Sequence, residues 1–205
     1  MLKKHLTLLG ITASLLLLFI STSYYPGGSQ QDKNTIGYDM KNNYLCNLFN
    51  EKAVNGMANP SRPWAVLGML VLCVSFAAFF IRFSKKIPSR SSANIIKYAG
   101  ISAMFFAFLV TTAYHDLMTT IGSIFYLLSI FYISVHVFMS KLFWLKILSI
   151  ACLLTLYINN YIYYSGYGLD ILPVMQKISL GLNLTWIVGL EYFTQAEDFR
   201  HSKRQ

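Results

Sequence analysis

The chain has 205 residues, of which 55% are hydrophobic and only 12% charged, and its mean hydropathy is +0.48. Soluble domains carry about 25% charged residues, so this composition excludes an ordinary soluble domain and indicates an integral membrane protein. The net charge of +9 does not indicate a nucleic-acid partner, because the basic residues follow a membrane topology instead.

Six apolar stretches predict six transmembrane helices, since a hydrocarbon layer needs about 20 apolar residues per helix. They leave no room for a soluble catalytic domain. We therefore predict an all-α fold, a single polytopic bundle over residues 1–205 with an ordered outer first loop at 25–63. The stretches are Leu6–Tyr24, Trp64–Phe83, Tyr98–Tyr114, Met118–Met139, Leu142–Tyr163 and Leu172–Phe193.

The first stretch has two interpretations. "MLKKH", an apolar core and then "STS" also describe a cleavable signal peptide. Against cleavage, Tyr24 and Tyr25 follow directly and are typical of an aromatic anchor at the membrane interface. We expect the helix to be retained.

The first loop begins with turn-forming residues and continues as "NNYLCNLFNEKAV". This segment predicts a short amphipathic helix on the membrane surface, with Leu45, Leu48, Phe49 and Val54 on one side. Pro63 is suited to the first turn of the second transmembrane helix.

The basic residues predict the orientation. With the N-terminus inside, the inner segments hold most of the 17 lysines and arginines, whereas the outer segments hold equal numbers of basic and acidic residues. The positive-inside rule then predicts a membrane protein with both termini cytoplasmic and a basic inner loop at 84–97. The inner basic residues are Lys3, Lys4, Arg82, Lys85, Lys86, Arg90, Lys97, Lys141, Lys146, Arg200, Lys203 and Arg204.

Polar residues gather at the predicted outer ends of several helices. Such residues are costly in a membrane, usually face the bundle interior and mark candidate sites. The alternative is structural: Asp116 caps the fourth helix, and Lys177 extends to the surface or pairs with Asp170. The predicted ligand-binding residues are Asp39, Asn43, Arg62, His115, Asp116, Asn160, Asp170 and Lys177.

Catalytic and metal chemistry have weak support. Zinc catalysis needs three protein ligands, but only His115 of the four histidines lies on the outer side and no HExxH is present, so we predict neither a metal nor a cofactor. His115 could act as a base for Ser165 or Cys46 only if the loops bring them together. At the inner end, Glu191 is expected to pair with Lys146 or Lys141.

"YYPGG", "GYDMKNNYLCNLF" and "NGMANPSRPWAVLGM" resemble small bacterial six-helix membrane proteins that are distantly similar to the damage-regulated autophagy modulator family. The likeness is motif-like over residues 24–70. It departs at Asn47, where such loops often carry Asp. The resemblance implies a six-helix membrane fold, a location in a bacterial inner membrane and no particular reaction. It is carried by Asn43, Tyr44, Leu45, Leu48, Asn59, Pro60, Arg62 and His115.

The preferred hypothesis is a non-enzymatic membrane module that binds a lipid headgroup or a partner membrane protein. It expects Arg62 and Lys177 to hold one anionic group. The rival is a membrane-embedded lipid hydrolase or transferase with catalytic His115 as base and Asp116 as its orienting group. That rival expects His115 within about 3 Å of a nucleophile or of the Asp116 network. If Arg62, His115 and Lys177 occupy separate environments, a scaffold role is expected.

Overall fold

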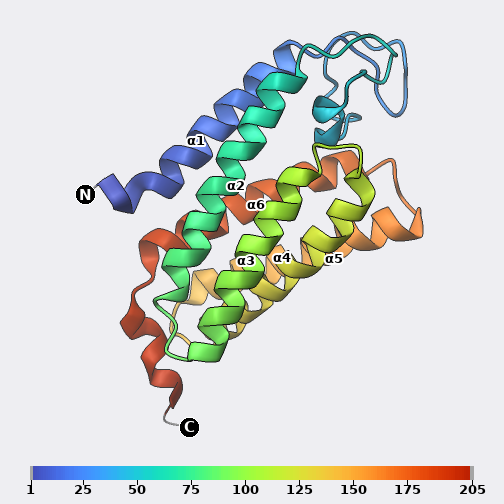
Figure 1. The fold of residues 1–205 in the computed structure, drawn as a ribbon. Helices are drawn as coiled ribbons and strands as arrows, with labels where there is room; N and C mark the ends of the chain where they lie inside the picture. The colour runs from blue at the N-terminus through green and yellow to red at the C-terminus, as the bar shows by residue number, and fades with distance from the viewer. Residues whose placement is uncertain (1, 204–205) are drawn as a thin grey trace.

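A computed structural model, in which residues 2–203 are described, is an all-α bundle whose successive long helices run in alternating directions (Figure 1). A single-turn 3-10 helix η1 (Leu45–Phe49) lies in the first loop, and η2 (Ala196–Lys203) follows the last helix. The prediction of an all-α helical bundle with an ordered first loop is confirmed. The long helices are α1 (Leu2–Ser23), α2 (Arg62–Ser84), α3 (Arg90–Leu109), α4 (His115–Phe138), α5 (Phe143–Ser165) and α6 (Leu172–Phe193).

Five of these helices, α1 to α5, are long and apolar enough to cross a membrane. The prediction of six such helices is therefore confirmed for five. Helix α6 has 22 residues but carries Gln176, Lys177, Asn183 and Glu191, and its sequence is less apolar than that of the other five. The fold is that of a helical membrane protein.

The predicted bounds are least accurate at α3, which was expected over Tyr98–Tyr114. The helix begins instead at Arg90, because the Ser89 hydroxyl accepts a hydrogen bond from the Ser92 backbone N–H at 3.4 Å and caps its first turn. The loop between α2 and α3 is therefore shorter than the basic loop predicted at 84–97, and part of that basic segment is helical.

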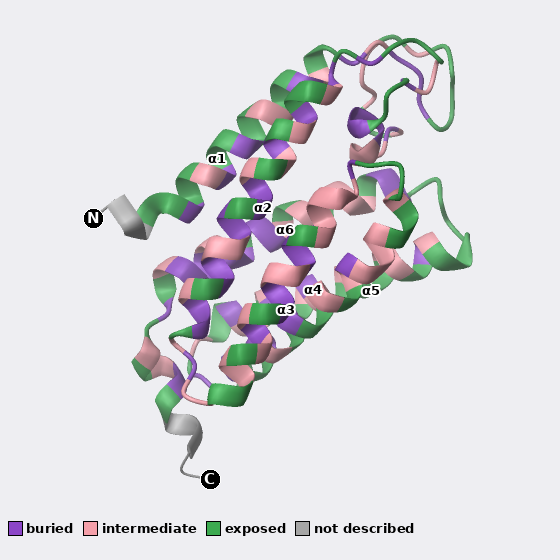
Figure 2. Ribbon diagram, viewed as in Figure 1, coloured by how far each residue is buried: buried purple, intermediate pink, exposed green. Residues whose placement is uncertain are grey.

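Helix α1 packs on α2 through small and polar residues. The Ser14 hydroxyl donates to the Gly68 carbonyl at 2.7 Å, and a Cβ atom at Gly10 would lie 1.8 Å from Ser75 Oγ. Small residues allow two helix backbones to approach closely. The opposite side of α1 exposes Leu16 and other large apolar residues (Figure 2). Helix α1 thus packs along α2 as part of the bundle.

The bundle has two distinct ends (Figure 1). We call the end that carries the first loop and the α3–α4 and α5–α6 turns the loop end, and the opposite end the basic end. Between them, a core of fully buried side chains joins α2 to α6 through Phe79, Phe80, Phe83, Trp186 and Ile187.

The first loop is ordered by buried asparagines. The Asn43 amide donates to the Gly28 carbonyl at 2.8 Å and accepts from the Asp39 backbone N–H at 2.8 Å. The Asn59 amide donates to the carbonyls of Asn47, Leu48 and Asn50.

The predicted surface helix in this loop is wrong. Only η1 forms, and Leu48 and Phe49 are buried in a small core with Tyr25 and Ala65. The hydrogen bonds from Asn59 fix the backbone around η1. They fold the apolar residues onto the bundle rather than onto a membrane surface.

At the basic end, charged residues of α2 and α6 pair with each other, although Ser134 Oγ, His136 Nδ1 and Glu191 Oε2 are buried without a partner among the described residues. Arg82 Nε lies 2.8 Å from Glu191 Oε1, and Arg82 also hydrogen-bonds Thr7 of α1. The expected pairing of Glu191 with Lys146 or Lys141 is therefore wrong.

Lys86 reinforces this end. Its Nζ donates to the carbonyls of Leu190, Glu191 and Thr194 at 3.0–3.3 Å. It thereby pairs carbonyl groups that the last turn of α6 leaves without helical partners.

Candidate functional site

A cavity of about 520 Å³ lies at the loop end, beneath η1 and among α2 to α6. Its volume is in the range typical of small-molecule sites. Apolar side chains line much of it, but it also holds hydroxyl, amide and imidazole groups. We call it the loop-end cavity. Its polar lining residues are Tyr44, His115, Thr119, Asn159, Asn160, Tyr163, Gln176 and Ser179.

Two polar atoms in this lining are buried without a hydrogen-bond partner among the described residues, namely Thr119 Oγ1 and Asn159 Oδ1. The Asn159 amide nitrogen donates to the Met175 carbonyl at 3.4 Å, so the amide oxygen is the group left to accept. An unsatisfied buried polar group costs about 1–3 kcal/mol. Native proteins usually pair such groups with water or a ligand.

A hydrogen-bonded chain runs along the rim of the cavity. His115 Nδ1 lies 2.9 Å from Asp116 Oδ1, and the Tyr163 hydroxyl donates to the same oxygen at 2.6 Å. Asp116 is exposed and lies in the first turn of α4, where the helix dipole favours a carboxylate. The prediction that Asp116 caps α4 is wrong, because the N-cap residue is Tyr114 and no side chain makes a capping hydrogen bond there.

Lys177 fastens the first loop to α6. Its Nζ donates to the Asn43 carbonyl at 2.6 Å and to the Pro173 carbonyl at 3.0 Å, and it lies 5.6 Å from the centre of the Tyr38 ring. It neither extends to the surface nor pairs with Asp170. The Tyr44 hydroxyl makes a second tie by donating to the Leu169 carbonyl at 3.3 Å. The first loop is thus clasped over the cavity.

Arg62 lies elsewhere. Its Nη1 is 3.0 Å from Glu51 Oε1 in an exposed ion pair, and the residue lines a separate groove with residues of α2 and α3. Arg62 and Lys177 therefore do not meet around one group, as the anion-binding hypothesis requires. Arg62, His115 and Lys177 occupy separate environments, the arrangement for which a scaffold role was expected, so any case for ligand binding rests on the lining of the loop-end cavity.

Three other predicted residues also lie outside the cavity. The Asp39 carboxylate accepts from the side chain and backbone of Asn42, and these hydrogen bonds lower the pKa of Asp39. Asn43 is fully buried within the loop, and Asp170 is exposed. Of the eight predicted residues, only His115 and Asn160 line the cavity, with Asp116 at its rim and Lys177 behind the loop.

Cys46 lines the same cavity as His115, so the fold does bring these two segments together. Burial raises the pKa of the Cys46 thiol to about 11. Because the thiolate is the reactive form, a catalytic cysteine needs a lowered pKa. Cys46 therefore does not have the environment of an activated nucleophile.

Sequence reasoning missed several lining residues, and part of the signal was present. Leu172, Gln176 and Ser179 follow the i, i+4, i+7 spacing of one helix face. Thr119 lies one turn after His115 on α4. These spacings identify a shared face but not the cavity that the face adjoins.

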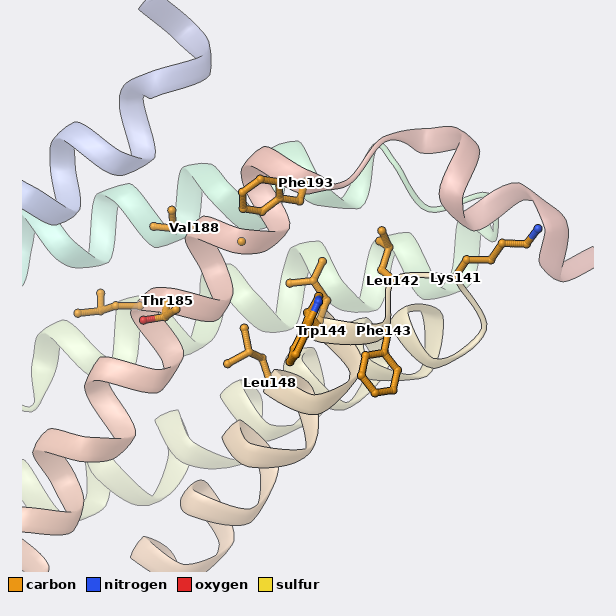
Figure 3. Close-up of a pocket in the computed structure, with 11 residues that line it drawn as sticks. Lys141, Leu142, Phe143, Trp144, Leu148, Thr185, Val188 and Phe193 are labelled. Atoms are coloured by element: carbon orange, nitrogen blue, oxygen red, sulfur yellow. The ribbon is translucent and has the colours of Figure 1, made fainter.

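A second cavity of about 850 Å³ opens between α5 and α6 near the basic end (Figure 3). Its lining is almost entirely aliphatic and aromatic, and the Lys141 amine points away from its middle. This basic-end groove holds none of the predicted site residues. Its surface would suit the acyl chains that surround any membrane protein, but it offers no specific recognition chemistry.

Within residues 2–203, no group of three His, Cys, Asp or Glu side chains is placed to hold a metal ion. No protein-family model matches the chain, and no curated protein or solved structure is detectably similar to it. The resemblance to the damage-regulated autophagy modulators stays a prediction. The structure gives two residues behind that resemblance, Asn43 and Asn59, a role in ordering the first loop.

Proposed function

We propose that the protein is a non-enzymatic membrane module that binds the headgroup of a membrane lipid in the loop-end cavity. The observation that carries the proposal is the pair of unpartnered buried atoms, Thr119 Oγ1 and Asn159 Oδ1, in the lining of one cavity. Neither atom is accessible from the cavity in this structure, so a bound headgroup would pair with them after a rotation of the two side chains and would then recover the cost of burying them.

The lining favours a neutral headgroup that donates hydrogen bonds. Asn159 Oδ1 can only accept, so its partner must carry an O–H or N–H donor, such as a hydroxyl, an amide or an ammonium group. The cations first expected to hold an anion are engaged elsewhere, Arg62 with Glu51 and Lys177 with backbone carbonyls. The headgroup class we propose is therefore a polyol or an amide rather than a phosphate.

The proposal includes a topology in which α6 also crosses the membrane. Its polar residues are paired inside the protein: Lys177 with the first loop, Asn183 with Tyr126 at 2.9 Å and Glu191 with Arg82. Polar groups paired in this way are tolerated within a membrane. With six crossings, the positive-inside rule supports cytoplasmic termini and an outward-facing loop end, and a bacterial inner membrane is the location that the resemblance implies.

The second candidate is a lipid hydrolase or transferase, favoured by the distance of 2.9 Å between His115 and Asp116. This is the geometry of a base with its orienting group. The raised pKa of Cys46 argues against that residue as the nucleophile.

Native mass spectrometry from a mild detergent tests the binding proposal. We expect wild-type protein to retain a lipid, and Thr119→Val and Asn159→Leu to lower its occupancy about tenfold or more, because each removes a hydrogen bond to the headgroup. The matched control is Thr185→Val in the basic-end groove, which should leave occupancy unchanged. Equal occupancy in all four proteins, or a wild type that retains no lipid, would contradict the proposal.

A further inference from the structure

A third cavity, of about 280 Å³, adjoins the loop-end cavity on the side nearer the middle of the bundle. We call it the lower chamber. The two share lining residues from four helices, and the lower chamber continues toward the middle of the bundle. The shared residues are Met69, Ala107, Val110, Thr119 and Ser179.

The lower chamber differs in chemistry from the cavity above it. Its walls are mainly apolar and include Leu72, Phe76 and Met104. At the level of Asn183, the Tyr126 hydroxyl already donates to the Asn183 amide oxygen at 2.9 Å, so these groups need no ligand. A dry apolar chamber of this kind binds apolar groups.

The change in polarity occurs at Thr119, whose side chain lines both cavities and whose Oγ1 is buried without a partner among the described residues. Ser123 and Asn183, which line the chamber below Thr119, are already hydrogen-bonded within the protein. A ligand that fits both spaces is therefore expected to be polar in the loop-end cavity and mainly apolar in the lower chamber. Such a ligand is an amphiphile, with its headgroup under the first loop and its tail in the bundle.

The dimensions limit the length of the tail. Helix α4 lines the chamber from Met118 to Tyr126, which corresponds to a depth of about 12 Å at 1.5 Å per residue. An extended alkyl tail much longer than that depth cannot lie entirely within the chamber.

We infer that the ligand is an amphiphile whose alkyl tail occupies the lower chamber. This inference rests on the proposed function, because it assumes that the headgroup binds in the loop-end cavity. It adds the class of lipid: a hydroxyl-bearing or amide-bearing head with no need for a charge, and an alkyl tail held inside the bundle.

Monoacylglycerols of increasing chain length are suitable probes, since they combine a diol head with one tail. For purified wild-type protein, we expect affinity to rise roughly fourfold per added methylene until the chamber is full, and then to level off. Ala107→Phe places a ring where the two cavities meet and should abolish that rise while monobutyrin, which barely extends below Thr119, still binds. Met104→Ala enlarges the chamber and should move the plateau to longer chains.

A monoacylglycerol with a diazirine at the end of its tail locates the tail directly. We expect crosslinks to chamber residues such as Met104 and Tyr126, and their loss in Ala107→Phe. Crosslinks confined to lipid-facing residues such as Phe105 and Ile124, which are exposed, would overturn the inference.

The two proposals fail differently. If Asn159→Leu weakens binding of every probe but Ala107→Phe changes nothing, the headgroup site stands and the tail inference is wrong. If Asn159→Leu has no effect on any probe, the headgroup proposal itself is wrong, and the tail inference with it. Size-exclusion and thermal-unfolding profiles that match the wild type ensure that each variant is folded.

Discussion

The two ends of the bundle use the same kinds of residue in opposite ways. At the basic end, Arg82, Glu191 and Lys86 meet groups of the chain itself across α1, α2 and α6. At the loop end, the side chains of Thr119 and Asn159 line a cavity, and each holds a buried polar atom without a partner among the described residues. The basic end also holds such atoms, on Ser134, His136 and Glu191, but the groove there is lined almost entirely by apolar side chains, and its Arg82 and Glu191 are paired with each other.

This difference shows why a polar residue in an apolar helix is an ambiguous signal. Both ends contain such residues, and from composition alone the charged residues are the strongest candidates for ligand binding. The charged residues prove to be structural: Arg82 holds Glu191, and Lys177 holds the first loop. The binding candidates are uncharged amides and hydroxyls, which cost less free energy to bury without a partner than charged groups do.

The largest expected effect on stability comes from removing the ion pair between Arg82 and Glu191 at the basic end. Arg82→Met leaves Glu191, whose side chain is only 6% exposed, without its cation. Removing one partner of a buried ion pair costs about 3–5 kcal/mol. We expect a loss of that size in the free energy of unfolding, measured by reversible denaturant titration in detergent.

The double variant Arg82→Met with Glu191→Met is the control for that experiment. Replacing both charges with apolar side chains removes the uncompensated carboxylate, so most of the stability should return. A double variant that is no more stable than Arg82→Met would mean that the ion pair does not link α2 to α6 as described.

A smaller effect is expected at the loop end from Asn43→Ala. The Gly28 carbonyl and the Asp39 backbone N–H would lose their partner, at a cost of about 1–3 kcal/mol. Because the loop core is separate from the main core, the damage should stay local. Limited proteolysis should cleave within residues 25–61 faster, with the bundle intact. Asn34→Ala, at an exposed loop position, should behave like wild type; equal cleavage of both variants would exclude the buried amide as the cause.

Helix type and number could be predicted from the sequence because apolar runs of this length have few alternatives in a membrane. The bounds of α6 were predicted as observed, whereas α3 was displaced because its Ser89 cap lies upstream of the apolar run. The cavity could not be predicted. It depends on which faces of five helices meet, and on whether Lys177 reaches a ligand or the Asn43 carbonyl.

Lys177→Met tests whether the hydrogen bonds of Lys177 to Asn43 and Pro173 hold the first loop over the cavity. The readout is the rate at which a thiol reagent labels Cys46. With the thiol pKa near 11, only about one thiol in a thousand is ionised at pH 8, against about one in four for an ordinary cysteine. Losing the lysine contacts should expose the thiol and raise the rate at pH 8 by up to about two hundredfold, the ratio of the two ionised fractions. The wild-type rate should keep rising beyond pH 10, whereas that of the variant should level off near pH 9.

Two controls complete the labelling experiment. Cys46→Ser identifies the labelled site, and Lys33→Met removes a lysine at an exposed position of the same loop. If Lys33→Met accelerates labelling as much as Lys177→Met, the loop is not held by the contacts of Lys177 to Asn43 and Pro173.

The smallest effect is expected from Arg62→Ala, and it decides the headgroup chemistry. The pair with Glu51 is solvent-exposed, with side chains 38% and 81% accessible, so its loss should cost less than about 1 kcal/mol. Lipid occupancy measured by native mass spectrometry should match that of wild type, because Arg62 lines a groove separate from the loop-end cavity. A loss of lipid as large as that in Asn159→Leu would restore the anionic headgroup predicted from the sequence, since only a negatively charged group would need this arginine.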